Sequence, residues 1–190
     1  MLTILDTIFS ILVLFILLSV FSLLILWVWG NFKADVPFIG VPKETLKEIE
    51  KALALNDDSV VYDLGCGDGR VLFYLKKNNP KAKYIGIENS LFPYILVSVN
   101  NWFFKLKNKE GIKIIRGNFF NTDIKDATHV FAYLYSHIVD DLLPKFDKEL
   151  KKGSRFVSMS FHFTSKAETQ EIDLKRNSYK IARKIYVYEF

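Results

Sequence analysis

The N-terminal part of the chain contains a long run without any charged residue. From Thr7 to Trp29 the sequence reads TIFSILVLFILLSVFSLLILWVW, which is 23 residues with neither an acid nor a base. About 20 apolar residues are enough for a helix to cross the hydrocarbon core of a bilayer. As a core helix it would need protein on every side, and the rest of a 190-residue chain is too short to supply that. We therefore expect a transmembrane anchor over residues 1–30.

The residues around this run predict how it is oriented. A cleaved signal peptide has a basic start and a shorter apolar core, and this segment has neither. Trp27 and Trp29 stand at its C-terminal end and lysines follow from Lys33 onward, whereas Asp6 is the only charged side chain before the run. Positively charged flanks stay in the cytoplasm. The pattern predicts a single-pass membrane protein with its larger part in the cytoplasm and the lipid bilayer as a partner.

The rest of the chain has the composition of one folded domain. All 26 basic residues follow residue 32, and aromatic residues make up 15% of the sequence, too many for a disordered chain. Pro37, Gly40 and Pro42 indicate a juxtamembrane linker over residues 31–42, followed by a single domain over 43–190. One cysteine and three histidines allow no disulfide within the chain and fit no familiar zinc spacing, so no metal is expected.

Short apolar runs alternate with helical patterns along the predicted domain. The runs typical of strands cover residues 60–64, 83–87, 112–115, 129–134 and 155–161. The patterns typical of helices cover residues 43–55, 70–78, 92–107 and 138–150. This alternation predicts an α/β fold, a Rossmann-like doubly wound and mostly parallel sheet. Residues 171–174 and 180–190, separated by Asn177-Ser178, predict a C-terminal antiparallel hairpin.

A glycine-rich turn after the first predicted strand is the most informative motif. The segment reads VVYDLGCGDGRV from Val60 to Val71. A dinucleotide-binding loop reads GxGxxG, and its third glycine would stand where this chain has Arg70. The spacing here is GxGxG, and Asp63 precedes it. An acid at this place can attract an ammonium or sulfonium group, and the glycine amides can take a carboxylate.

Two further features follow the next predicted strands. Glu88 ends the second strand, where a carboxylate can accept both hydroxyls of a ribose. Asn118 and Phe119 follow the third strand and offer an amide and a ring near the place of an adenine. Open α/β sheets bind ligands at the carboxyl ends of neighbouring strands. The candidate cofactor-binding residues are Asp63, Gly65, Cys66, Gly67, Gly69, Glu88, Asn89, Asn118 and Phe119, with Cys66 expected to pack rather than to act as a nucleophile.

These motifs resemble the class I, seven-stranded S-adenosylmethionine-dependent methyltransferases. Within that class, the segment DATHVFAYLY…LLPKF…ELKKGSRFVS across 126–158 and GIE at 86–88 are similar to a small membrane-anchored group. This group includes bacterial and archaeal proteins and the mitochondrial lysine methyltransferases that modify adenine nucleotide translocase and the ATP synthase c-subunit. The resemblance covers about residues 36–190. It implies S-adenosyl-L-methionine as cofactor and a membrane or membrane-adjacent protein as substrate.

The resemblance also implies methyl transfer to a lysine by in-line (SN2) displacement. The amine must first lose its proton, and burial beside aromatic rings lowers the pKa of an amine. Tyr133 and Tyr135, at the end of the fourth predicted strand, are our candidate catalytic residues because they can form such a wall. We interpret His137 as a solvated or capping side chain and His129 as structural.

Other functions stay open on the sequence alone. An anchor also concentrates an enzyme near a lipid, quinone or other small-molecule acceptor, and a non-catalytic ligand-binding membrane protein is a further alternative. A nucleic-acid methyltransferase is indicated only by the net charge of +5 and the pI of 9.1. The motif [DNS]PP[YFW] is absent where Tyr133-Leu134-Tyr135-Ser136 stands, so nucleic acid is disfavoured as a partner. The lysines around 43–51, 105–109 and 145–152 fit anionic lipid head groups or solvated helix faces.

Overall fold

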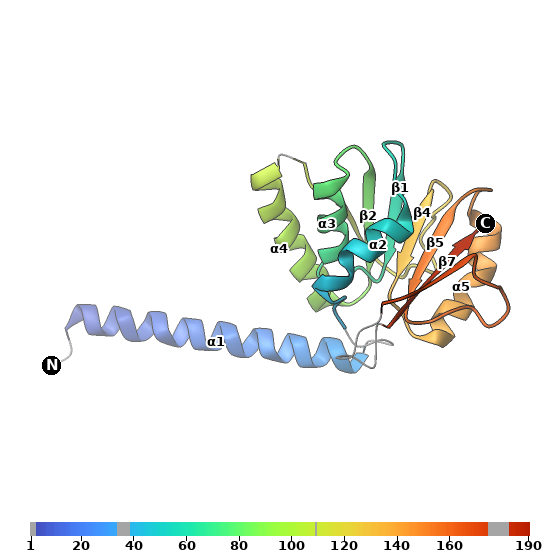
Figure 1. Ribbon diagram of the computed structural model, residues 1–190. Coiled ribbons are helices and arrows are strands. Elements are labelled where there is room, and N and C mark those ends of the chain that lie inside the picture. Colours follow the sequence, from blue (N-terminus) through green and yellow to red (C-terminus); the bar gives the residue numbers. More distant parts are fainter. Residues whose placement is uncertain (1–2, 34–38, 109, 175–182) are drawn as a thin grey trace.

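The computed structural model of the chain describes residues 3–33, 39–108, 110–174 and 183–190 (Figure 1). Its described residues form one sheet of seven strands in the order β3-β2-β1-β4-β5-β7-β6. The strands β1 to β5 run parallel, and β7 is antiparallel to both of its neighbours. The strand bounds are β1 Val60–Leu64, β2 Lys83–Glu88, β3 Lys113–Arg116, β4 His129–Ala132, β5 Arg155–Met159, β6 Gln170–Asp173 and β7 Lys184–Glu189.

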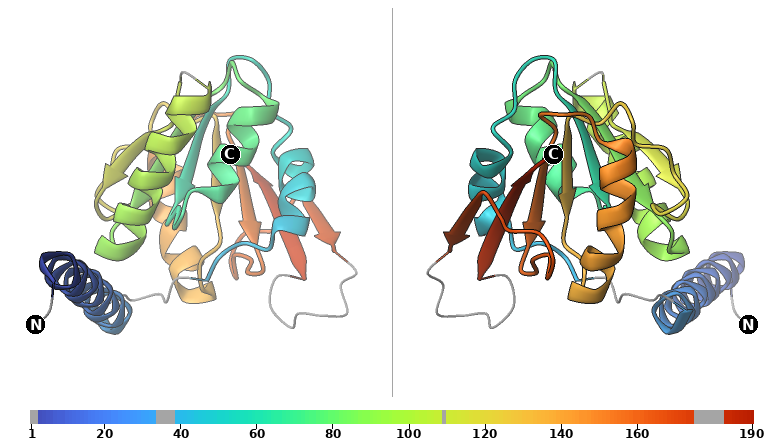
Figure 2. Two further views of the ribbon diagram at one scale, coloured as in Figure 1. Left: turned by 90° about the vertical axis from the view of Figure 1, so that its left-hand side faces the viewer. Right: turned by 90° about the vertical axis from the view of Figure 1, so that its right-hand side faces the viewer.

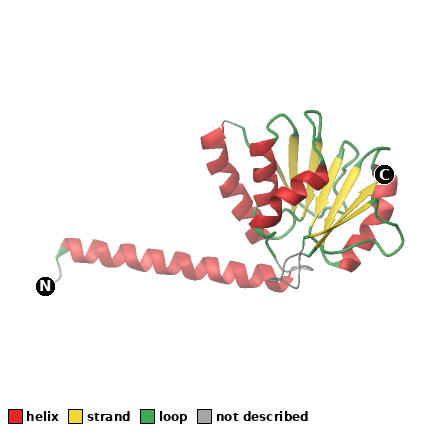
Figure 3. Cartoon of the chain, in the orientation of Figure 1, coloured by secondary structure: helices red, strands yellow, loops and turns green. Residues whose placement is uncertain are grey.

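Helices cover both faces of this sheet (Figures 2 and 3). Apolar side chains of α2, α3 and α4 join one buried cluster, and those of α5 join the other. Successive strand residues alternate between the clusters, as Val61 and Tyr62 do in β1. The predicted doubly wound, mostly parallel α/β fold is therefore confirmed. The helices are α1 Ile4–Lys33, η1 Lys43–Thr45, α2 Leu46–Leu53, α3 Arg70–Asn78, α4 Leu91–Asn108 and α5 Ser136–Glu149.

The predicted C-terminal antiparallel hairpin is confirmed as the pair of strands β6 and β7. Its second strand is shorter than predicted and begins at Lys184 rather than at Lys180. The strand β7 also pairs with β5, so it lies inside the sheet and leaves β6 at the edge. Interior strands are buried on both faces, which explains the aromatic and β-branched run from Ile185 to Tyr188. The expected turn at Asn177-Ser178 lies outside the described residues.

Two strands end earlier than the apolar runs predict. The strand β4 stops at Ala132 although the apolar run continues to Leu134, and β5 stops at Met159 rather than at Phe161. At Ser160 the backbone takes a φ of 75°, which turns the chain out of the sheet. Leu134 lies outside the strand but is buried in a core cluster, which explains why the apolar run continues past the end of β4. Both early ends fall at the carboxyl edge of the sheet.

The helix α1 projects from the domain (Figure 1), and it contacts α4. Its residues Ile4–Val28 are long and apolar enough to cross a membrane by length and composition, and none of that stretch is buried in protein. The structure also does not show a buried core helix, the alternative that the sequence disfavours. Hydroxyl groups along α1 donate to carbonyl oxygens four residues earlier, which satisfies them without water, at Ser10, Ser19 and Ser22.

Candidate cofactor and acceptor site

The loop between β1 and α3 has a backbone that requires glycine. Its three glycines have positive φ angles, 76° at Gly65, 58° at Gly67 and 79° at Gly69. A Cβ atom at Gly69 would lie 2.6 Å from atoms of Phe73 and Val97. The loop therefore passes close under α3 and α4, and a side chain there would force the helices apart.

The amides of this loop are already used within the protein. The amides of Gly65 and Cys66 donate to the carbonyl oxygen of Ile87, and the Gly69 amide donates to the carbonyl of Cys66. The Gly67 amide donates to the carboxylate of Glu88. The expectation that these amides take a ligand carboxylate is wrong for this arrangement, because each one already has an acceptor. The glycines provide shape and close approach instead.

Glu88 joins three loops at the carboxyl edge of the sheet. Its Oε2 accepts the Gly67 amide at 3.0 Å and its Oε1 accepts the Ser90 amide at 2.8 Å, while its main-chain carbonyl accepts the Gly117 amide at 3.1 Å. The residue is only 7% exposed. A carboxylate has about four acceptor positions, so two remain for the hydroxyls of a bound ribose. The structure thus fixes this carboxylate and leaves it able to bind a ligand.

Asp63 is a buried acid at the end of β1, with 3% of its surface exposed. Burial raises its pKa well above the usual value, and repulsion from Glu88 and Asp68 raises it further. A cationic group bound beside these three carboxylates would offset both effects. An ammonium or sulfonium group is therefore the ligand chemistry that this end of the site favours.

Cys66 packs between the loop and β2, as predicted. Burial raises the pKa of its thiol, with repulsion from Asp63 and Glu88 adding to the effect, so the thiol stays protonated and unreactive. A Cβ atom at Gly86 would lie 2.7 Å from its Sγ. The glycine of the GIE motif is thus explained by the close approach of Cys66.

Arg70 ties the loop to the segment that follows the anchor. Its guanidinium binds the Asp68 carboxylate through Nε at 2.9 Å and Nη2 at 2.6 Å, and its Nη1 donates to the carbonyl of Val41 at 2.9 Å. Asp68 also accepts the Arg70 amide at 3.2 Å, although the N-cap residue of α3 is Gly69. In the sequence, Arg70 stands out only because it replaces the third glycine of a dinucleotide-binding loop. The pairing of Arg70 with Asp68 has one signal in the sequence, the acid two residues before the arginine.

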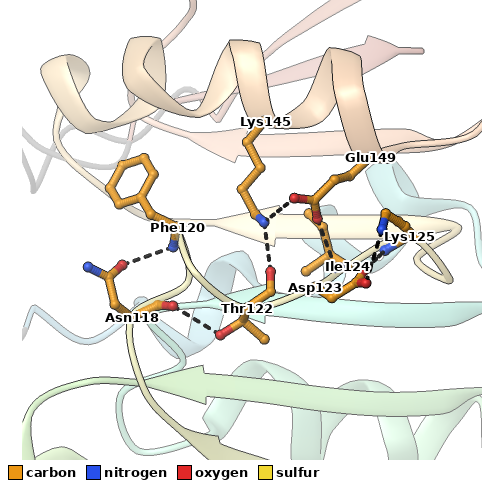
Figure 4. A network of polar contacts seen from close by, with 8 residues as sticks. All are labelled: Asn118, Phe120, Thr122, Asp123, Ile124, Lys125, Lys145 and Glu149. Atoms are coloured by element: carbon orange, nitrogen blue, oxygen red, sulfur yellow. Dashed lines mark hydrogen bonds and ion pairs between the residues drawn. The ribbon is translucent and has the colours of Figure 1, made fainter.

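Asn118 forms a tight turn after β3 (Figure 4). Its Oδ1 accepts the Phe120 amide at 2.9 Å, and its main-chain carbonyl accepts the Thr122 hydroxyl at 3.0 Å. This is a local side-chain turn in which the polar side chain replaces a backbone acceptor. Phe119 is half-buried against the core cluster on the α5 face, with its ring 4.9 Å from that of Phe120.

A pair of charges on α5 holds the same loop from the other side (Figure 4). The Lys145 ammonium donates to Glu149 and to the carbonyl of Thr122, both at 2.7 Å, and Glu149 accepts the Ile124 amide at 3.0 Å. Burial alone would raise the pKa of Glu149, but the bonds from Lys145 and Ile124 outweigh it and lower the pKa. The pair was not recognised in the sequence, where these residues belong to an apparently solvated helix face.

The candidate acceptor wall lies next to the glycine loop. Tyr133 and Tyr135 follow β4 directly, and Leu134 between them lies 3.2 Å from the position of a Cβ on Gly65. Tyr133 is half-buried, and burial raises the pKa of its phenol although a hydrogen bond with Ser160 opposes the shift. Both tyrosines therefore stand at the same carboxyl edge of the sheet as Asp63, since β1 and β4 are neighbours.

Tyr135 belongs to a small group of rings at this edge. Its ring stacks on His137 with centroids 6.3 Å apart and lies 6.0 Å from Phe161. Tyr135 is the N-cap residue of α5 and has an extended backbone conformation, so it lies just outside the helix. Sequence reasoning missed Phe161 because it was assigned to a strand, where its ring would face the core.

The remaining predicted residues are placed as follows. Asn89 is exposed just after β2, between Glu88 and Ser90. His137 is exposed in the first turn of α5, as expected for a solvated side chain. His129 lies in β4, bonds Thr128, and has a pKa lowered to about 4 by burial and by Arg155, which fits its structural interpretation. Asp63, Gly65, Cys66, Gly67, Gly69, Glu88 and Asn118 come together at adjacent strand ends.

This site fits S-adenosylmethionine in its charges and shape. Asp63 and Glu88 are the acids that would face its cationic end and its ribose, and the glycine loop leaves the close approach that a side chain would block. When bound, this cofactor supplies an activated methyl group on a sulfonium. Fold and site together define a methyltransferase of the class I type.

Comparison with known proteins identifies the family. A family model described as the ANTKMT methyltransferase domain matches residues 63–171. The chain is similar to a protein-lysine N-methyltransferase of Saccharolobus islandicus, with 33% identity over 137 residues that make up 69% of this chain and 80% of that protein. The chain belongs to the ANTKMT methyltransferase family. The predicted resemblance to S-adenosylmethionine-dependent methyltransferases is confirmed.

Solved structures share the fold. An RNA methyltransferase from Salinibacter ruber, in complex with S-adenosyl-L-homocysteine, superimposes with a TM-score of 0.71 at 24% identity over 80% of this chain and 93% of its own. A precorrin-6Y C5,15-methyltransferase from Geobacter metallireducens gives a TM-score of 0.58 at 15% identity over 81% and 90%. Proteins named for such different acceptors share this fold, so the fold does not identify the acceptor.

Proposed function

We propose that this chain is a membrane-anchored protein-lysine N-methyltransferase that uses S-adenosylmethionine. The observation that carries the proposal is the 33% identity to a protein of that name, which extends over most of both chains. The site supports it, because buried acids suited to a cationic cofactor stand beside aromatic side chains suited to an amine.

The residues of this chain have separate tasks in such a reaction. Glu88 and Asp63 would hold the cofactor at its ribose and cationic ends, which leaves Tyr133 and Tyr135 to surround the acceptor. Ring faces attract the ammonium group of an arriving lysine and hold it at the site. Burial acts in the opposite direction on its pKa and favours release of the proton to water before methyl transfer. Because the methyl group is already activated, positioning and exclusion of water are the main contributions of the protein.

The helix α1 supports the anchoring part of the proposal. It is apolar over Ile4–Val28, and none of that stretch is buried in protein, as expected of a span in lipid. Lysines follow it from Lys33 onward, so the domain belongs on the cytoplasmic side. An anchored enzyme meets membrane proteins and membrane-adjacent proteins first, and these are the substrates we propose.

The full-length protein reconstituted in membranes with methyl-labelled S-adenosylmethionine tests this function. Label should enter protein, and hydrolysis of the labelled protein should release methylated lysine. The Glu88→Gln variant should lose most of this labelling, while Glu189→Gln, at an exposed acid far along β7, should keep it. Label found only in lipid or only in nucleic acid would refute the lysine acceptor and point to the other acceptor classes.

A further inference from the structure

The outer face of α4 is an exposed apolar stripe on an otherwise charged domain. Six large apolar side chains of this helix are more than a third exposed, among them Trp102 at 57% and Leu106 at 66%. They are Leu91, Ile95, Val99, Trp102, Phe103 and Leu106, and we call them the α4 stripe. Their spacing of three and four residues places them on one side of a helix. The opposite side of α4 is buried through Val97 and Asn101.

Such a stripe needs an explanation because soluble surfaces avoid it. Contiguous apolar patches on a domain surface mark a contact with another protein or with a membrane. The stripe contains a tryptophan and a phenylalanine, which are typical of helices that lie in the membrane interface. Successive residues of a helix are about 100° apart, so Lys105 and Lys107 lie on opposite sides of Leu106 and flank the stripe. Their apolar stems can extend along it toward anionic head groups.

The position of α4 relative to α1 indicates that the α4 stripe contacts a membrane rather than another protein. The two helices contact each other, and α4 covers the side of the domain from which α1 projects (Figure 1). In the left view of Figure 2, which looks nearly along α1, α4 lies on the near side of the domain. The helices run at a steep angle to each other, so a bilayer crossed by α1 would have its surface along α4. The stripe is thus continuous with the proposed membrane contact.

We propose that the α4 stripe is a second membrane contact, in which α4 lies in the cytoplasmic interface and inserts its apolar side chains among the lipids. This inference rests on the proposed anchoring of α1. It assigns α4 a task beyond covering the sheet, since two contacts fix the orientation of the domain on the bilayer whereas one span leaves it free to rotate. The carboxyl edge of the sheet, where the site lies, would then keep one orientation relative to the membrane.

Fluorescence of Trp102 in the full chain tests this proposal. The chain has three tryptophans, so the variant Trp27→Phe/Trp29→Phe leaves Trp102 as the only one. In vesicles of mixed zwitterionic and anionic lipids, its emission should shift to shorter wavelength, lose intensity when the lipids are brominated near the head groups, and resist quenching by iodide. A matched control moves the single reporter to the exposed position 148 of α5 in the variant Trp27→Phe/Trp29→Phe/Trp102→Phe/Lys148→Trp, and that emission should behave as in water.

Two outcomes would overturn the proposal. In the first, Trp102 is not shielded: iodide quenches it as strongly as the α5 reporter, and brominated lipid has no effect. Alternatively, a second copy of the chain covers the stripe, shown by shielding that ignores brominated lipid and disappears when the protein is diluted in the vesicles. A third variant, Trp29→Phe/Trp102→Phe, reports on Trp27 in α1. If brominated lipid fails to quench Trp27 as well, the proposed anchoring of α1 is wrong. Methylation assays on the same variants test the enzymatic function separately, so a failure of the anchoring is distinguished from a failure of the proposed activity.

Discussion

The amide of Gly67 donates a 3.0 Å hydrogen bond to Oε2 of Glu88, which connects the glycine loop after β1 to the end of β2. The same carboxylate accepts the Ser90 amide through its other oxygen. Charge-assisted bonds of this kind are stronger than bonds between neutral groups. Glu88 therefore fixes the shape of the loop before any ligand arrives, in addition to the ribose contact expected from the sequence.

The substitution Glu88→Gln should weaken cofactor binding through both of these roles. A glutamine carries an amide nitrogen that faces one of the two donors, so one of the two bonds is lost along with the charge. We expect the dissociation constant of S-adenosylhomocysteine to rise about tenfold or more, equivalent to about 1.4 kcal/mol. Calorimetry on the full chain in detergent measures it, with Glu189→Gln as control. Unchanged affinity would contradict the assignment of Glu88 to the site.

The substitution Asp63→Asn should make the ligand-free protein more stable and the liganded one less so. An amide removes a buried charge that burial and two neighbouring acids disfavour, so the melting temperature without ligand should rise. S-adenosylmethionine, with its sulfonium, should lose more affinity than the uncharged thioether of S-adenosylhomocysteine. Equal losses for the two ligands would show that Asp63 does not face the sulfonium.

The pH dependence of the wild-type protein follows from the raised pKa of Asp63. The folded protein binds this proton more tightly than the unfolded chain, so the stabilisation is complete below about 3.8 and decreases as pH rises through the folded pKa. Affinity for a cationic cofactor should change in the opposite direction and increase with pH. The contribution of Asp63 to both trends should be absent from Asp63→Asn, as the difference between wild type and variant in titrations of melting temperature and of binding can show.

His129 should contribute a dependence of opposite sign. Its pKa falls from 6.5 to about 4 on folding, so the unfolded chain binds the proton more tightly. The free energy of unfolding should therefore decrease as pH falls from 6.5 toward 4. Denaturant titrations of the wild type and of His129→Gln, compared at each pH, isolate this slope. A difference between them that does not change with pH would mean that the ring remains solvated.

The pair of Gly86 and Cys66 predicts a steric coupling. A methyl group at Gly86 would lie 2.7 Å from Sγ of Cys66 and 3.0 Å from Leu72, so Gly86→Ala should cost about 1–3 kcal/mol of stability. Removing the sulfur with Cys66→Ala should recover part of that loss. A double-mutant cycle by chemical denaturation measures the coupling, and strict additivity would rule out the contact.

The Lys145 and Glu149 pair should control the loop that carries Asn118. Replacing Lys145 by methionine leaves Glu149 largely buried without its ammonium partner, which costs about 3 kcal/mol. Hydrogen exchange at the Ile124 amide should become faster and cofactor affinity should fall. The double variant Lys145→Met/Glu149→Leu should regain stability but not affinity, because the loop then lacks both of its anchors on α5.

Much of the fold can be predicted from the sequence, because the helix over residues 70–78 and the strand over 60–64 match their apolar patterns residue by residue. The insertion of β7 between β5 and β6 could not be predicted, since strand order depends on long-range pairing rather than on local periodicity. Strand ends were overestimated at Leu134 and Phe161, where burial outside the sheet looks the same as burial within it.

The candidate site also has a part that local sequence patterns predict and a part that they do not. Glycine spacing and the acids after β1 and β2 locate the cofactor end, because the close backbone approach allows few residue types there. The long-range contacts of Arg70, Lys145 and Ser160 join segments far apart in the chain, and no local pattern reports them. The tyrosines after β4 lie at the expected edge, and their catalytic role is still a prediction.

The bond from Arg70 to the carbonyl of Val41 sets a maximum height for the enzyme above the bilayer. Between Lys33, the last residue of α1, and Val41 the chain can extend at most about 28 Å. With α1 across a bilayer, as proposed, the loop held by Arg70 cannot move farther than that from the cytoplasmic end of α1. The tether would then select substrates by their distance from the membrane. Lysines in a thin layer over the lipid surface come within reach of the site, and identical lysines in bulk solution seldom do.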